Sequence, residues 1–399
     1  MIPIAITGMG VVSPIGVGRE AFFDALADPD AAAEASFTME SSVLKDPAAE
    51  GAEIAEVRGF EAKDYLGSKG LRNFDRLTRF MIVAGKKALE DAGVKRDGEF
   101  IEHEPARVGI SSATAYGSLD AITELLRVAE LEAPRYINPG RFPNTVINAA
   151  AGYVSIWEDL RAPNTTVVDG NCGALDAILN AETHLRNDRG DAFLVGGGEI
   201  LSDPLFVALA KLGAVGPGPD RDERVDGGFR LGEGAAYFCV ERSEVAAARG
   251  ARIHAEIIGY GTAFEPPAAQ AALVHGSSLA VERAIQGAIA DANIVPGEID
   301  VVASSVGGLL ELDQAEMDGI DAVLGPDVPV ARPKDIHGET FGAAGAMAIA
   351  QSLAWMQGAP IAPLHRGTAP AQVDTVLIIT VGFYGNVTAA LLRAVSEEP

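Results

Sequence analysis

The feature that most constrains the fold is an alternation, along the whole chain, of short apolar runs with longer helical patterns. Apolar runs typical of buried strands occur at residues 4–7, 108–111, 165–168, 192–195, 235–240, 253–258, 301–304 and 376–381. Between them lie stretches with helical character at residues 76–92, 174–186, 278–292 and 345–357. Because such helices cover the faces of a mostly buried sheet, the alternation predicts an α/β fold.

The order of these features repeats. In the first part a strand runs into Gly8, an extended run follows at 108–112, a turn at Asn171 opens a helix, and a strand closes on 196–199. The second part repeats this order at 259–262, 301–305, 334–338 and 382–385. The repeat predicts two duplicated halves, residues 1–245 and 246–399, with an insertion at about 110–165 in the longer first half. Corresponding helix N-termini would then face each other, which places a site between them.

Composition excludes several classes of function. Aspartate and glutamate number 56 against 31 lysines and arginines, a net charge of −25, which disfavours nucleic acid and anionic membranes as partners. Cys172 and Cys239 lie in apolar runs and suggest no disulfide scaffold, and there is no secretory leader pattern and no apolar run of membrane-spanning length. We therefore expect a cytoplasmic protein.

No cofactor or metal is predicted. The glycines at 8–10 and 196–198 do not complete a dinucleotide-binding fingerprint, so close packing of strand against helix is the better interpretation. The six histidines form no metal-binding pattern and no CxxC is present.

Asn171 is the position with the clearest chemical meaning. It lies at a predicted strand-to-helix turn, where the helix dipole lowers a thiol pKa and free backbone N–H groups can stabilise an oxyanion. Asparagine can exchange hydrogen bonds there, but it cannot form a thioester.

Motifs spread over nearly the whole chain carry a family resemblance. They lie at residues 6–16, 75–93, 142–152 with 160–163, 226–235, 337–345 and 382–386. Together they resemble the β-ketoacyl-acyl-carrier-protein synthases of the thiolase superfamily. The resemblance implies a five-layered αβαβα fold, built from two duplicated halves.

In that family one cysteine accepts the acyl chain and two histidines assist decarboxylation of the extender unit. Aligning the motifs places Asn171 at the cysteine position, Ser305 at the first histidine and Glu339 at the second. Lys334 occupies the family's lysine position, and Cys172 falls one residue late. The resemblance therefore implies a family scaffold without its catalytic set.

One branch of the family has this character, namely the chain-length-factor (ketosynthase-β) subunits of type II polyketide synthases. The string Asn-Cys-Gly-Ala-Leu-Asp-Ala at 171–177 is similar to that branch, although its usual amide is glutamine. The resemblance implies a heterodimer with an active ketosynthase-α that elongates carrier-bound polyketide or fatty acyl chains. Carrier proteins are typically acidic, so the charge of −25 predicts docking mainly on the partner.

Two alternatives stay open at this stage. One is a divergent active acyltransferase that uses Cys172 as nucleophile and His337 as base. The other is a homodimeric pseudoenzyme that binds an acyl carrier.

A substrate tunnel and a dimer edge are also predicted from the resemblance. Spacing places Gly117, Asp120 and Glu124 on one helical face, where such subunits carry their length-deciding side chains. The other predicted tunnel residues are Tyr116, Leu119 and Ile122 on the neighbouring face, with Phe229 and Phe383. The β-branched run at 165–168 is suited to an edge strand that pairs with a partner.

Overall fold

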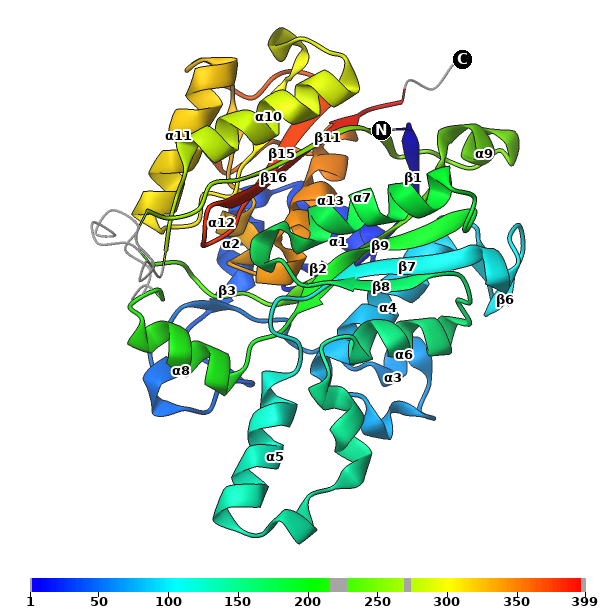
Figure 1. Ribbon diagram of the computed structural model, residues 1–399, viewed down its shortest axis with the longest axis vertical. Helices are drawn as coiled ribbons and strands as arrows, with labels where there is room; N and C mark the ends of the chain where they lie inside the picture. Colours follow the sequence, from blue (N-terminus) through cyan, green and yellow to red (C-terminus); the bar gives the residue numbers. More distant parts are fainter. Residues whose placement is uncertain (1, 216–227, 269–273, 396–399) are drawn as a thin grey trace.

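The computed structural model describes residues 2–215, 228–268 and 274–395, and shows a mixed sheet enclosed by helices (Figure 1). The predicted α/β class is confirmed, and so is the thiolase-like arrangement of two duplicated halves. Two residues of one family motif, 226 and 227, lie outside the described residues.

The strand order shows the duplication directly. In each half the five main strands follow the order first, fifth, fourth, second, third, counted along the chain. In the first half these are β1 (Ile4–Ser13), β10 (Gly234–Arg242), β9 (Ala192–Glu199), β7 (Val108–Ala113) and β8 (Asn164–Val167). In the second half they are β11 (Ala255–Phe264), β16 (Asn386–Arg393), β15 (Thr375–Val381), β12 (Val301–Ala303) and β13 (Val330–Ala331), with β14 (Leu364–Arg366) added at the edge. Among the described strands, the two sets pair with each other where Ile4 to Ile6 of β1 lie beside β11.

Three apolar cores separate five layers. The central core packs α7 (Gly173–Arg186) and α13 (Ala344–Met356) between the two sets of strands. One outer core packs α4 (Arg76–Asp91) and α6 (Ala149–Glu158) on the first set. The other packs α10 (Ser278–Ala292) and α11 (Leu310–Leu324) on the second set. The predicted helices thus occur within two residues of their expected ends.

The glycines of β1 pack against α4 as expected. A Cβ on Gly8 would lie 2.3 Å from the Ala88 carbonyl oxygen, and one on Gly10 would lie 2.0 Å from that of Ala84. Asp75 caps the same helix by accepting a hydrogen bond from the Thr78 N–H at 2.8 Å. These residues are therefore explained by the close approach of strand and helix.

The remaining elements are short or peripheral. The helices are α1 (Arg19–Leu26), α2 (Pro29–Ser36), α3 (Lys63–Leu66), α5 (Leu119–Leu131), α8 (Asp203–Lys211), α9 (Ser243–Ala248) and α12 (Lys334–His337). The minor strands are β2 (Gly16–Val17), β3 (Phe37–Thr38), β4 (Ile54–Ala55), β5 (Lys95–Arg96) and β6 (Glu99–Phe100). In Figure 1, α5 and the segment after it project from the lower end of the body.

Two local expectations need correction. Gly117 precedes α5, with φ of 60°, so it does not share a helical face with Asp120 and Glu124. The edge strand ends at Val167 rather than at Val168. The helix begins two residues later than the spacing predicts, and the strand ends one residue earlier. The division between the halves at residues 245 and 246 stays a prediction.

Candidate functional site

Asn171 lies where the two halves meet. It belongs to the single turn η6 (Gly170–Cys172) that leads directly into α7, and its side chain is buried. Its Nδ2 donates to Glu339 Oε2 and to the backbone oxygen of Val381, both at 3.2 Å. Its Oδ1 is buried without a hydrogen-bond partner. The amide therefore ties the first half to two segments of the second.

Glu339 and Lys334 form the charged part of this site. Lys334 Nζ lies 2.6 Å from Glu339 Oε2 and donates to Ser305 Oγ at 3.0 Å. The other carboxylate oxygen of Glu339 accepts the Phe341 N–H at 2.8 Å. The structure thus brings Asn171, Ser305, Lys334 and Glu339 into one hydrogen-bonded group, which we call the amide–acid–lysine network.

Aromatic rings cover this network. Phe341 lies 5.1 Å from the ring of Tyr116, 5.7 Å from Phe229 and 5.9 Å from Phe383, between ring centroids. Phe229 and Phe383 also line a cavity beside Asn171 of about 10 Å³, which is room for about one water molecule. Phe341 itself has φ of 41°, a conformation that costs free energy for a bulky residue. Sequence analysis did not single out Phe341, since a positive φ at a non-glycine residue leaves no sequence signal.

Cys172 faces a different environment from Asn171. Its thiol is fully buried against the Thr380 carbonyl oxygen, 3.4 Å away, and burial raises its pKa to about 12. His337 stacks on Phe22 with 5.5 Å between ring centroids, and both ring nitrogens are buried without a partner. Burial lowers the pKa of His337 to about 3. A thiol held in its neutral form is a poor nucleophile, so this geometry argues against the Cys172–His337 alternative.

The predicted tunnel residues divide into two groups. Tyr116 and Leu119 pack in the same apolar cluster as Phe229, Phe341 and Phe383. Asp120 and Glu124 instead line a separate hollow of about 630 Å³, together with Arg72, Arg79, Arg127 and Arg141. Ile122 is half-buried on α5, and a Cβ on Gly117 would meet the Ile147 side chain at 2.9 Å. A tunnel through any of them stays a prediction.

Two buried carboxyls outside the predicted set hold the site's backbone. Glu199, at the end of β9, accepts the Ala115 N–H at 2.7 Å, and burial raises its pKa to about 7. Glu316 of α11 accepts the Ser305 N–H at 2.7 Å, and burial raises its pKa to about 8. The sequence signal that could have identified Glu199 and Glu316 is an acidic residue on the otherwise apolar face of a strand or helix.

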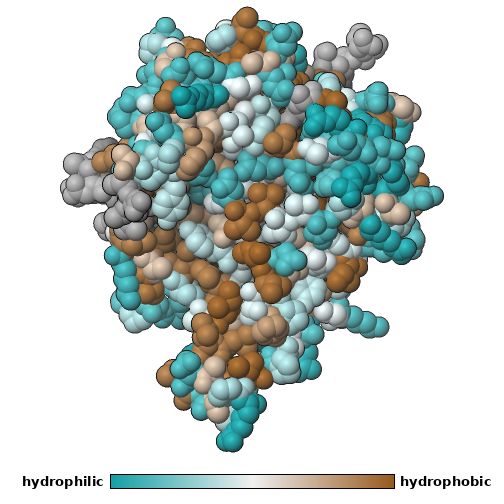
Figure 2. All heavy atoms as spheres, in the orientation of Figure 1, coloured by the Kyte–Doolittle hydropathy of each residue, from teal (hydrophilic) through white to brown (hydrophobic). Residues whose placement is uncertain are grey.

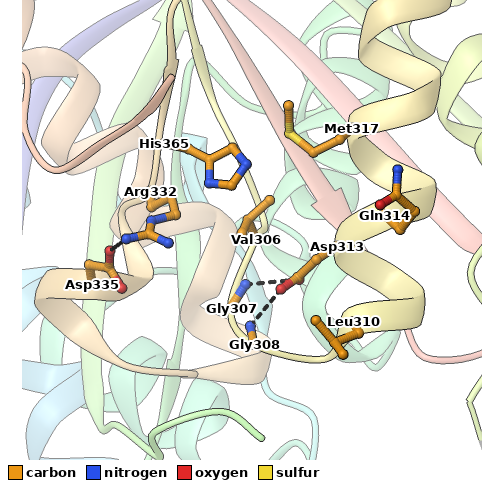
Figure 3. Close-up of a pocket in the computed structure, with 10 residues that line it drawn as sticks. All are labelled: Val306, Gly307, Gly308, Leu310, Asp313, Gln314, Met317, Arg332, Asp335 and His365. Atoms are coloured by element: carbon orange, nitrogen blue, oxygen red, sulfur yellow. Dashed lines mark hydrogen bonds and ion pairs between the residues drawn. The ribbon is translucent and has the colours of Figure 1, made fainter. Parts of the chain in front are cut away.

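A further hollow, of about 290 Å³, lies behind the loop that follows Ser305 (Figure 3). Asp313 forms the wall that it shares with the small cavity, and its carboxylate accepts the Gly307 and Gly308 N–H groups at 3.0 and 2.8 Å. Arg332 and His365 line the opposite side in Figure 3. The hollow is thus separated from the network by a strip of backbone.

Neither a metal site nor a membrane span emerges from the described ranges. Within residues 2–215, 228–268 and 274–395, no three His, Cys, Asp or Glu side chains are placed to hold a metal ion. No helix within those ranges is long and apolar enough to cross a bilayer.

Comparison with known proteins gives consistent matches over the chain. The family model "Beta-ketoacyl synthase, N-terminal domain" matches residues 1–246, and "Beta-ketoacyl synthase, C-terminal domain" matches residues 254–367. A putative polyketide beta-ketoacyl synthase 2 of Streptomyces coelicolor is 31% identical, covering 99% of this chain and 95% of the relative. A 3-oxoacyl-[acyl-carrier-protein] synthase 2 of Coxiella burnetii is 30% identical, covering 86% of this chain and 83% of the relative.

Among solved structures, the ishigamide ketosynthase/chain length factor matches with a TM-score of 0.85 and 25% identity. The match covers 99% of this chain and all of that one.

Proposed function

The chain belongs to the beta-ketoacyl synthase family, and we propose that within it the chain serves as a non-condensing subunit of the chain-length-factor kind. In this role it pairs with an active ketosynthase that elongates carrier-bound polyketide or fatty acyl chains. The observation that carries the proposal is the amide–acid–lysine network. The resemblance assigns the family's cysteine and two histidines to Asn171, Ser305 and Glu339, so an amide, a hydroxyl and a carboxylate stand there, and the carboxylate is paired with Lys334.

The chemistry of the network opposes condensation. The Asn171 amide provides no atom that can hold an acyl group as a thioester. Glu339 places a carboxylate where enolate charge would develop, and negative charge there opposes the transition state. With room for about one water, the cavity also leaves no space for an acyl chain next to Asn171.

A surface suited to a partner supports the pairing. Exposed apolar side chains follow one another over α5, η5 (Pro139–Thr145), α6 and the end of β8, and Figure 2 shows apolar residues gathered over this lower part of the molecule. We call them the apolar strip: Leu126, Leu131, Tyr136, Phe142, Val146, Ile147, Ile156 and Val168. In the described part of the sheet, β8 is the outermost strand beside it and pairs only with β7. An open edge next to exposed apolar residues is what a partner sheet would cover.

The choice of carrier site follows from charge. At −25 the chain on average repels an acidic carrier protein, so the carrier docks mainly on the ketosynthase partner. The hollow beside Asp120 brings four arginines together, but the four acidic side chains that line it, Asp75, Asp120, Glu124 and Asp203, balance their formal charge.

The test uses the purified chain, a ketosynthase with an intact cysteine and two histidines encoded beside it, and acyl- and malonyl-carrier thioesters. We expect neither a covalent adduct nor a β-ketoacyl product from the chain alone, by mass spectrometry. With both proteins present, product should form with a length that differs from that of the partner alone. Condensation by the chain alone would overturn the proposal. A stable homodimer that does not bind the ketosynthase would favour the carrier-binding pseudoenzyme.

The Asn171→Cys variant sharpens the test. Restoring the thiol supplies one of three missing groups, and residues that act as a unit lose their effects non-additively. We therefore expect at most slow self-acylation and no chain extension.

A further inference from the structure

The hollow of about 290 Å³ behind the loop that follows Ser305 has two unlike sides (Figure 3). The side formed by α11 and the loop before it includes the apolar residues Leu310 and Met317. The opposite side carries Arg332 and His365. A hollow of this size lies near the lower limit for small-molecule sites, which typically combine an apolar lining with a few polar groups.

Arg332 is the charged group of the polar side. Its Nη2 forms an ion pair with Asp335, and Figure 3 shows another nitrogen of the guanidinium turned towards the hollow. The Arg332 side chain is 29% exposed, so part of it is accessible to a ligand. Asp335 also lies 3.5 Å from Arg230, so Arg332 is not its only counter-ion. The guanidinium of Arg332 can therefore bind a second anion.

The neighbouring titratable groups leave the donors of Arg332 available. Both oxygens of the Asp313 carboxylate accept backbone N–H groups, from Gly307 and Gly308, so this carboxylate is directed towards the loop. Burial and the nearby Arg332 lower the pKa of the His365 imidazole. This ring is therefore neutral at pH 7 and can donate one N–H. Arg332 and His365 thus offer N–H donors at one end of the hollow.

The apolar side favours a ligand that has a hydrocarbon part. Leu310 is 55% exposed, and Val306, which is buried, forms the apolar surface between the two sides in Figure 3. Covering such surface removes it from water, and each buried methylene group of a ligand strengthens binding by roughly fourfold. A ligand that is charged at one end and apolar at the other matches both sides.

We propose that this hollow binds a short-chain aliphatic carboxylate. Its carboxylate group lies on Arg332 and His365, and its hydrocarbon chain lies against Leu310 and Met317. An acidic side chain of another protein has no comparable hydrocarbon tail, so the ligand is the free acid. The site is independent of the proposed pairing with a ketosynthase, because every residue that binds the ligand belongs to this chain.

The net charge of the chain acts against anions in general, but it does not decide binding in this hollow. At about 0.15 M salt, charges more than about 8 Å apart are largely screened from each other. The guanidinium in direct contact with the carboxylate is screened much less, so it dominates the local interaction.

Titration of the full chain with hexanoate at about 0.15 M salt, followed by isothermal calorimetry, tests the site. We expect one bound hexanoate per chain. Acetate has the carboxylate without the tail, and hexanol has the tail without the charge. Each of these two probes should bind at least roughly tenfold more weakly than hexanoate.

Two variants locate the binding. Arg332→Gln removes the cation and should weaken hexanoate binding roughly tenfold or more. Gln314→Glu adds a negative charge to an exposed residue of the lining and should weaken it by roughly threefold or more. Because Gln314 is exposed, this second variant decides the question even if loss of the Arg332–Asp335 pair prevents folding.

Gln286→Glu on α10 is the matched control. Gln286 and Gln314 are both exposed, and each donates a hydrogen bond to an acidic residue four positions away on its own helix. Gln286 does not line the hollow, so this variant should bind hexanoate as the wild type does. The proposal would be overturned by a lack of saturable hexanoate binding, by equal affinities for hexanoate and acetate, or by equal weakening in the two glutamine variants.

Discussion

The interior cavity at Asn171 and the apolar strip differ in how completely their groups are satisfied. Around Asn171, nearly every polar atom has a partner within the chain, and the remaining space holds about one water. On the apolar strip, Leu131 is 75% exposed and Ile156 is 77% exposed. A buried polar group without a hydrogen-bond partner destabilises the folded chain. An exposed apolar group contributes to binding only when another surface covers it. The contrast teaches that the polar groups of the cavity are almost all satisfied within the chain, so the cavity is nearly complete internally, whereas the apolar strip is left uncovered.

The largest effect is expected from breaking the ion pair in the cavity. Lys334→Met leaves the Glu339 carboxylate buried without a cation, which costs about 3–5 kcal/mol in the free energy of unfolding. The double variant Lys334→Met/Glu339→Gln should recover most of this loss, because no charge remains unpaired. Urea unfolding of the two variants measures the difference.

Lys63→Met, which removes an exposed lysine 3.8 Å from Glu61, is the control and should change stability little. If Lys334→Met were as stable as this control, the cavity would not be the internally complete site described above.

The next effect concerns the strip. Ile156→Asp places a charge on the surface proposed to be covered, and such a change typically costs about 2–3 kcal/mol of binding free energy, or roughly 30- to 150-fold in Kd. Sedimentation equilibrium with the ketosynthase partner measures it.

Val295→Asp is the matched control, since Val295 is 61% exposed beside α10 and lies outside the strip. Equal affinities for the two variants would show that the strip is not the interface.

Sequence reasoning reached most of the fold because its evidence was periodic. The β-branched runs and the helical patterns between them, such as residues 76–92, are set by burial on known faces. Sequence reasoning could also locate four residues of the site, because each lies at a set distance along the chain from a family motif. These residues are Asn171, Ser305, Lys334 and Glu339. These four residues do converge in the structure.

What the sequence did not reveal depends on non-local contacts. Phe341 adopts φ of 41° because Glu339 holds its N–H and three other rings pack around it, and no local pattern encodes that arrangement. The separation of Asp120 and Glu124 from the cavity arises because α5 begins only at Leu119 and projects away from the body. Spacing alone gave the helical face but not the direction of the helix.

A smaller effect should appear as a pH dependence of stability. Burial raises the pKa of Glu316 to about 8, so its carboxyl stays protonated in the folded chain at pH values where it is ionised in the unfolded chain. The free energy of unfolding therefore falls as the pH rises from the carboxyl's pKa in the unfolded chain towards 8. Between pH 6.5 and 8.5 the wild type should lose about 1–2 kcal/mol more than Glu316→Gln, whose side-chain oxygen can still accept the Ser305 N–H. Unfolding curves across this range measure the effect. A parallel pH profile in the two proteins would show that the Ser305 backbone is held without a protonated carboxyl.

The smallest effect is expected at the remaining cysteine of the site. Cys172→Ala removes a fully buried sulfur next to Thr380, which should cost about 1 kcal/mol of stability. It should leave product formation by the assembled pair unchanged, because a thiol whose pKa is raised to about 12 takes no part in acyl transfer. The measurement is the rate of β-ketoacyl product formation with saturating ketosynthase, and Cys239→Ala, which removes the other buried thiol, is the control. If Cys172→Ala abolished turnover and Cys239→Ala did not, Cys172 would take part in the reaction. The cavity would then be a working reaction site, and the contrast drawn above between a satisfied interior and an uncovered surface would be wrong for the interior.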